Sequence, residues 1–162
     1  MKNFRIAFAL AVACLAAGLV TSTAGAQAPT ESDMEILAEK IIADKKLLVA
    51  ANMELTEDEA AAFWPLYDAY NADLAEINLG LAELVEAYAV GYRDGTLTDG
   101  QAGELLADFM LLEQAEVDLK RSYLPRFSEV LPAKKVARYY QIENKIRAAV
   151  KYQIAEVVPL VE

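Results

Sequence analysis

Histidine is absent from the 162-residue chain, and Cys14 is the only cysteine. Imidazole is the commonest general base and metal ligand near neutral pH. Its absence excludes Ser-His-Asp and Cys-His catalysis, histidine-ligated zinc and Glu-x-x-His di-iron sites. After removal of the N-terminal segment that contains Cys14, the only soft metal ligands left are the methionines Met34, Met53 and Met110. They are too few to form a metal-sensing site. We therefore expect no metal site and no cofactor.

The sequence has one long apolar run, Ile6–Val20, preceded by two basic residues and followed by small ones. This order is typical of a secretory signal peptide. The run has about 15 residues, fewer than the roughly 20 that a membrane-spanning helix needs, so a retained anchor is the weaker alternative. We expect a periplasmic protein that loses residues 1–26 on export and does not insert into the membrane after cleavage.

Two cleavage sites fit the small residues that end the signal. Cleavage between Ala26 and Gln27 leaves a polar N-terminus, whereas cleavage after Ala28 would place Pro29 directly after the cut, where proline obstructs processing. We expect the first site to be used. Cys14 then leaves with the signal, so the mature chain has no thiol and no disulfide.

Acidic side chains outnumber basic ones by 25 to 15, which gives a net charge of −10. Removal of Lys2 and Arg5 with the signal leaves 13 basic side chains against 25 acidic ones, a net charge of −12. Such a surface repels nucleic-acid phosphates and anionic lipid headgroups, so neither is an expected partner.

Strand signals are absent from the mature chain, and proline and glycine are few, so the pattern predicts helices only. We expect a short flexible leader over residues 27–32, a single all-α domain over 33–158 and a C-terminal tail over 159–162. Short turns divide the domain into four long, partly kinked antiparallel helices. The first is predicted over 33–51, with an inward side formed by Ile36, Leu37, Ile41 and Leu48.

The second helix, predicted over 57–92, carries the strongest pattern in the chain. Its apolar residues are spaced 4, 3, 4, 3, 4, 3 and 4 apart, the 3.5-residue period of helices packed at a shallow angle. Pro65 predicts a kink or a short break. At about 1.5 Å per residue the helix is roughly 55 Å long, too long for one copy to cover, so we expect a homodimer. The seam residues are Phe63, Tyr67, Tyr70, Leu74, Ile77, Leu81, Leu84 and Tyr88.

The third helix, which begins after Thr98, is expected to bend at Pro125. Glu116 interrupts its apolar stripe. A buried carboxylate without a partner is costly, so we place Glu116 at the margin of the packed face and Ala115 or Val117 on the inward side.

The fourth helix is predicted to begin with Pro132 at its first position, where proline is tolerated, and to end at Pro159. Glu143 and Arg147 stand four residues apart on it and are expected to pair on a solvated face. Its apolar stripe consists of Val136, Tyr139, Ile142, Ile146, Val150, Ile154 and Val157.

Three of the helix starts share a motif in which leucine precedes a residue that begins the helix. Threonine followed three residues later by Glu or Gln is a capping box, and the leucine packs back onto the new helix. Only the second copy matches Leu-Thr-x-x-Gln fully, because the first has glutamate in place of glutamine and the third has proline in place of threonine and lysine in the last position. The copies are Leu55, Thr56 and Glu59; Leu97, Thr98 and Gln101; and Leu131 with Pro132.

In an exported all-helical chain, these motifs resemble the Spy/CpxP-like, or Leu-Thr-x-x-Gln, family of periplasmic proteins, with this chain as a divergent acidic member. The resemblance covers roughly residues 33–158. It implies a cradle-shaped dimer of long kinked helices that acts as an ATP-independent chaperone or inhibits an envelope stress sensor. The family's cradle has a positively charged concave face, so this acidic chain must either form local basic patches or prefer different clients.

A client or partner surface is predicted where aromatic and basic side chains are interleaved. Tyrosine offers apolar contact area with a polar tip, which suits loose association. For each residue the alternative is an ordinary structural role, such as filling the gap beside a kinked helix. The predicted surface consists of Trp64, Arg138, Tyr139, Tyr140 and Lys145.

We therefore expect a chaperone-like protein that binds partly unfolded envelope proteins under stress. One alternative is a regulatory accessory protein that docks on an envelope sensor domain and inhibits it, and another is a helical structural or assembly protein without a client. An enzyme is not expected. Paired carboxylates remain available after export, but glycoside hydrolysis needs a cleft that long regular helices rarely form.

Overall fold

The computed structural model describes residues 44–161, which form four helical segments and contain no strand. The first segment covers 44–53 within the described part of the chain, followed by α3 (Glu57–Arg93), α4 (Asp99–Val130) and α5 (Ala133–Val157). The all-α prediction is confirmed for this range. The predicted signal 1–26, its cleavage site, the leader 27–32 and the start of the first helix lie outside the described residues. No helix within 44–161 is long and apolar enough to cross a membrane.

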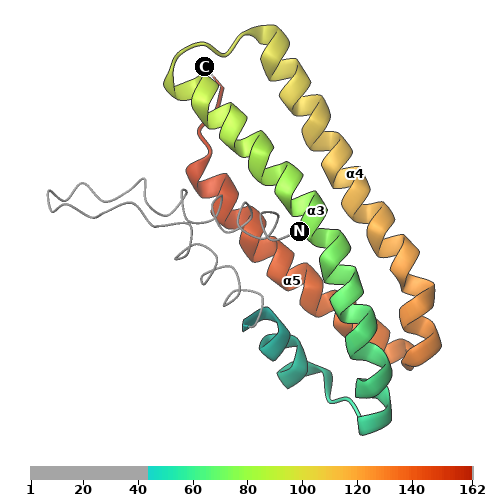
Figure 1. Ribbon diagram of the computed structural model, residues 1–162. Coiled ribbons are helices and arrows are strands. Elements are labelled where there is room, and N and C mark those ends of the chain that lie inside the picture. Colours follow the sequence, from blue (N-terminus) through green and yellow to red (C-terminus); the bar gives the residue numbers. More distant parts are fainter. Residues whose placement is uncertain (1–43, 162) are drawn as a thin grey trace, which may run out of the picture.

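The helices α3 and α4 pack as an antiparallel pair, and α5 returns along α3 (Figure 1). Near the far end of α5, the Tyr88 hydroxyl of α3 donates a hydrogen bond to the backbone carbonyl of Pro159 at 2.8 Å. The segment 44–53 contacts both α3 and α5, because Lys46 bonds Asp68 at 2.6 Å and Lys45 bonds Glu143 at 2.9 Å. A narrow interior therefore runs along α3.

Both predicted capping boxes form. The Glu59 side chain accepts a hydrogen bond from the Thr56 backbone N–H at 2.8 Å, and Gln101 does the same for Thr98 at 3.0 Å. Pro132 departs from its predicted position: it is the N-cap of α5 rather than the first helical residue, and it makes no side-chain cap bond. Proline has no side-chain acceptor for the first-turn amides, which explains the missing bond. Of the motif leucines, Leu131 is buried, and Leu55 and Leu97 are half-buried.

Neither internal proline breaks its helix. The α3 helix continues through Pro65, and α4 continues through Pro125, so the short break considered at Pro65 does not occur. Each helix loses one backbone hydrogen bond at its proline. The flanking residues Phe63 and Tyr67 are buried, so their packing holds α3 on both sides of the lost bond.

Two glycines serve the pairing of α3 with α4. Gly95 in the connecting turn has φ 63°, in the left-handed region that glycine enters without steric cost. Within α3, a Cβ added to Gly80 would lie 2.9 Å from Cδ2 of Leu112, so the missing side chain permits close approach of α4.

The core is an aromatic cluster drawn from α3, α4 and α5. The ring centroids of Phe127 and Tyr139 lie 4.8 Å apart, and those of Phe63 and Tyr139 lie 5.2 Å apart in an edge-on arrangement. Edge-on and tilted pairs of this kind stabilise beyond the area they bury. The first four residues of the predicted α3 seam are buried and the last four are half-buried. The buried rings are Phe63, Tyr67, Tyr70, Tyr123, Phe127 and Tyr139.

The inward side of the first helical segment lies one position from its prediction. Leu48 is 48% exposed, whereas Val49 and Met53 are fully buried against the aromatic cluster. Successive residues of a helix point about 100° apart, so one position separates an outward from an inward side chain. The prediction for Leu48 was therefore wrong.

Candidate functional site

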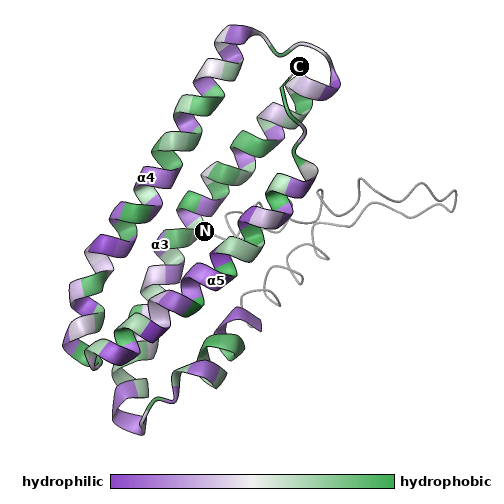
Figure 2. Ribbon diagram, turned by 180° about the vertical axis from the view of Figure 1, so that it is seen from behind, coloured by the Kyte–Doolittle hydropathy of each residue, from purple (hydrophilic) through white to green (hydrophobic). Residues whose placement is uncertain are grey.

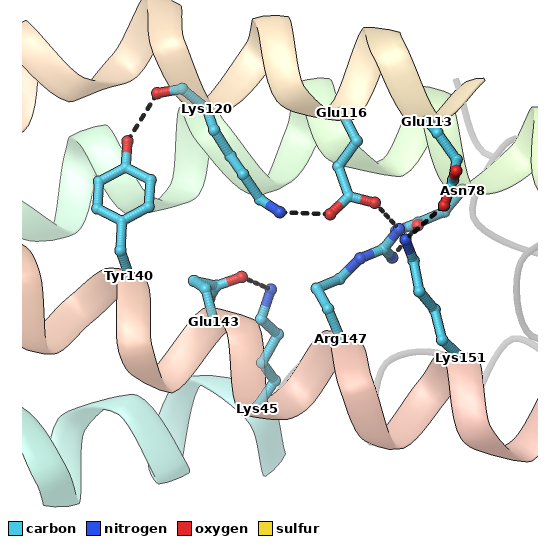
Figure 3. A network of polar contacts seen from close by, with 9 residues as sticks. All are labelled: Lys45, Asn78, Glu113, Glu116, Lys120, Tyr140, Glu143, Arg147 and Lys151. Carbon is cyan, nitrogen blue, oxygen red and sulfur yellow. Dashed lines mark hydrogen bonds and ion pairs between the residues drawn. The ribbon is translucent and has the colours of Figure 1, made fainter. Parts of the chain in front are cut away.

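Glu116 is buried in the interior between the long helices, contrary to the prediction that placed it at the margin. Its side chain is 6% exposed, while Val117, one of the residues expected inside, is among the exposed apolar side chains. The Glu116 carboxylate accepts hydrogen bonds from Arg147 of α5 and from Lys120 of α4 (Figure 3), the latter at 2.5 Å. Two cations thus offset the cost of burying this carboxylate.

The two cations keep Glu116 ionised. Burial alone would raise the pKa of its carboxyl, but the hydrogen bonds from Arg147 and Lys120 outweigh burial and lower the pKa to about 2. At neutral pH the group is therefore a fixed negative charge and cannot act as a general acid.

Arg147 ties three helices together. One of its terminal nitrogens reaches Glu116 of α4, and the other donates to the side-chain oxygen of Asn78 of α3 at 2.6 Å. One turn farther along α5, Lys151 bonds Glu113 at 2.9 Å. Because Arg147 is planar and nearly buried, these contacts fix the axial position of α5 relative to α3 and α4.

A second buried ion pair joins the segment 44–53 to α5. Lys45 bonds the Glu143 carboxylate at 2.9 Å and the Asn71 side chain of α3 at 2.6 Å. Burial lowers the pKa of the Lys45 ammonium, while Glu143 acts in the opposite direction. The predicted solvated pair of Glu143 with Arg147 was wrong: both side chains are buried, and each bonds a residue of another helix.

These groups form a structural network rather than a reactive one. Burial raises the pKa of the Tyr70 and Tyr139 phenols, and the negative charge of Glu143 raises it further, so both phenols stay protonated at neutral pH. The Glu143 carboxylate faces Lys45 and the Glu116 carboxylate faces Arg147, both at hydrogen-bond distance. Residues 44–161 contain no group of histidine, cysteine, aspartate or glutamate side chains arranged to hold a metal ion.

The five residues of the predicted client surface do not form one surface. Tyr139 is fully buried among aromatic rings, and its assignment to the surface was wrong. Tyr140 is half-buried and donates its hydroxyl to the Lys120 carbonyl at 2.8 Å. The Arg138 guanidinium lies 3.1 Å from the carboxylate of Glu54.

The remaining two residues of that prediction lie on different parts of the fold. Trp64 is half-buried and packs on Phe63, with ring centroids 5.0 Å apart, and the Lys46 ammonium lies 5.2 Å from its ring. Lys145 is exposed on α5.

An exposed apolar face on α4 was missed by the sequence reasoning. Leu106, Met110, Val117 and Leu124 are 59%, 54%, 43% and 47% exposed, and we call these four residues the α4 apolar face. They are spaced 4, 7 and 7 residues apart, which places them on one side of the helix. That spacing was visible in the sequence. Apolar residues recur along the whole of α4 in Figure 2.

A groove between α4 and α5 continues this face. It has a volume of about 400 Å³ and is open to the surface rather than enclosed. The α4 side contributes Lys120, Arg121 and Leu124, and the α5 side contributes Ala133, Ala137 and Tyr140. We call this the α4–α5 groove. Its walls are mainly apolar, and Lys120 and Arg121 are its charged lining residues.

Charge is distributed unevenly along the chain. The stretch from Asp73 to Asp118 holds eleven acidic side chains and one basic one, whereas the stretch from Lys120 to Lys151 holds nine basic and two acidic ones. Many of the basic groups lie within ion-pair distance of acidic side chains on neighbouring helices: Lys135 with Glu59, Arg138 with Glu54, Arg147 with Glu116 and Lys151 with Glu113. The local basic patch expected on α5 is therefore largely neutralised within the fold.

No protein-family model, curated protein or solved structure matches this chain.

Proposed function

We propose that this chain is an exported, ATP-independent chaperone-like protein that holds partly unfolded envelope proteins on the α4 apolar face and in the α4–α5 groove. The α4 apolar face carries the proposal. A row of exposed apolar side chains along one side of a helix indicates an interaction surface. The resemblance to the Spy/CpxP-like family and the predicted export signal support the same function.

The physical basis is loose apolar contact with the client. The acidic surface of the chain repels nucleic acid and anionic lipid, so these do not compete for the site. Met110 and Leu124 offer flexible and branched apolar side chains that accept many partners. The surrounding acidic surface keeps the chaperone soluble when a client is bound. Binding of this kind needs no nucleotide and no metal.

We further propose that the chain forms a homodimer. The seam residues Ile77, Leu81, Leu84 and Tyr88 of α3 are only half-buried in the single chain, so a second copy has apolar area to cover there. The same part of the sequence carries eleven acidic side chains against one basic one, from Asp73 to Asp118. Screening of that repulsion by salt should strengthen the dimer. Sedimentation at low and high salt tests this expectation.

The function is tested by aggregation of several unrelated unfolded proteins, followed by light scattering, with the exported and purified chain present at one copy per client. We expect slower aggregation of most clients. If the chain fails with all of them but binds one envelope sensor domain tightly, the regulatory alternative replaces the chaperone. Failure of both leaves a helical structural or assembly role.

A further inference from the structure

We propose that the α4–α5 groove selects apolar protein segments that carry carboxylates beside their apolar side chains. This inference rests on the proposed function and names the class of segment that this site takes. It follows from the shape of the groove and from the basic side chains that line it.

The walls of the groove suit an apolar segment. Ala133 and Ala137 are small and exposed on α5, which leaves room between the two helices, while Leu124 supplies an apolar wall from α4. The Tyr140 hydroxyl donates a hydrogen bond to the Lys120 carbonyl at 2.8 Å. The tyrosine thus joins α4 to α5 and leaves its ring as an apolar part of the lining.

Both charged lining residues of the groove are basic, and one of them, Arg121, makes only a long contact with an acidic side chain. Lys120 donates to Glu116 at 2.5 Å and its side chain is only 23% exposed, so its ammonium is already engaged within the fold. The Arg121 side chain is 76% exposed, and its guanidinium lies 3.8 Å from Asp118, too far for a strong hydrogen bond. Arg121 can therefore pair with a carboxylate of a bound segment.

The local charge at the groove, which differs from that of the acidic part of the chain, makes this site selective. The stretch Asp73–Asp118, which includes most of α4 before the groove, repels carboxylates, whereas Arg121 attracts them. An exposed pair of this type changes the affinity by a factor of about two to five at low salt. The preference should shrink at high salt because exposed charges are screened.

Two fluorescent peptides with the same apolar residues, one flanked by aspartate and one by lysine, test the inference by fluorescence anisotropy with the mature chain. We expect the aspartate peptide to bind about two- to five-fold more tightly at low salt. Arg121→Glu should abolish or reverse this preference. Arg93→Glu changes the net charge equally at an exposed position far from the groove, and it should keep the preference.

A second pair of variants tests the location. Ala137→Trp fills the groove and should weaken both peptides, whereas Ala107→Trp adds the same side chain at an exposed position of α4 outside the groove and should not. Equal affinities of the two peptides, a preference that survives Arg121→Glu, or full binding by Ala137→Trp would overturn the inference. So would conversion of a dimer to a monomer by Ala137→Trp, because a second copy would then occupy the groove. Selective binding of the aspartate peptide without any slowing of aggregation would support the groove and contradict the chaperone.

Discussion

Arg147 of α5 donates a hydrogen bond to the buried carboxylate of Glu116 of α4, inside the interior that α3 closes with Asn78. Glu116→Leu would leave the guanidinium buried without its counter-ion. We expect a loss of about 3–5 kcal/mol in the free energy of unfolding, measured with urea at pH 7. The double variant Glu116→Leu with Arg147→Met removes both charges and should recover most of that loss. A loss below about 1 kcal/mol in the single variant would contradict the role given to this pair.

Acid should unfold the chain partly through Glu116. The pKa of its carboxyl falls from 4.5 to about 2 on folding, so the folded state favours the ionised form. The resulting stabilisation is complete above about pH 4.5 and is lost as the pH falls toward 2; it amounts to a few kcal/mol at most. Glu116→Gln should flatten the pH dependence of unfolding in this window relative to the wild type. Parallel curves for the two proteins between pH 2 and 4.5 would contradict the pKa assignment.

Two buried tyrosines should respond differently to loss of the hydroxyl. The Tyr123 hydroxyl donates to Asp73 at 2.6 Å, so Tyr123→Phe should cost about 1 kcal/mol of unfolding free energy. The Tyr139 hydroxyl has no hydrogen-bond partner within the described residues, so Tyr139→Phe should be neutral or stabilising. Chemical denaturation of both variants measures the difference. A larger loss for Tyr139→Phe than for Tyr123→Phe would show that the Tyr139 hydroxyl is bonded in solution.

The capping box at the start of α4 should contribute measurably. Thr98 accepts a hydrogen bond from the Gln101 backbone N–H, so Thr98→Ala should cost about 1 kcal/mol in urea unfolding. Thr96→Ala is the matched control, because Thr96 is exposed in the preceding turn and lies outside the box. Equal stability of the two variants would argue against a contribution from the cap.

Local features of the fold could be predicted from the sequence because their determinants lie close together in the chain. Thr56 and Glu59 are three residues apart, and the bonds between them close within one helical turn. The seam of α3 was found from its spacing, and its members Phe63, Tyr67, Tyr70 and Leu74 are buried. These patterns need no knowledge of which helix lies opposite.

The polar interior could not be predicted, because it depends on which helices meet. Burial of the Glu116 carboxylate is tolerated only because Arg147, 31 positions later, donates a hydrogen bond to it from α5. Glu143 likewise needs Lys45, 98 positions earlier. Glu143 and Arg147 are four residues apart, so the sequence spacing predicted an ion pair between them. In the structure each of them pairs with a residue of another helix instead.

The candidate site was missed for a related reason. Tyr139 and Tyr140 are adjacent, and they differ in position by about 100° around α5, so one lies in the core and the other lines the groove. The sequence alone did not show which side of α4 or α5 remains uncovered. The heptad spacing of Met110, Val117 and Leu124 was the available signal, but a second stripe of apolar residues, which faces inward, runs along the same helix.

The most direct test of the chaperone proposal compares two leucines of α4 in the aggregation assay. Leu124 lines the groove, whereas Leu111 is 67% exposed and lies outside both the groove and the α4 apolar face. With circular dichroism confirming that both variants are folded, we predict that the wild type and Leu111→Asp slow client aggregation, while Leu124→Asp loses most of that effect. No protection by the wild type, or equal protection by the two variants, would contradict the account.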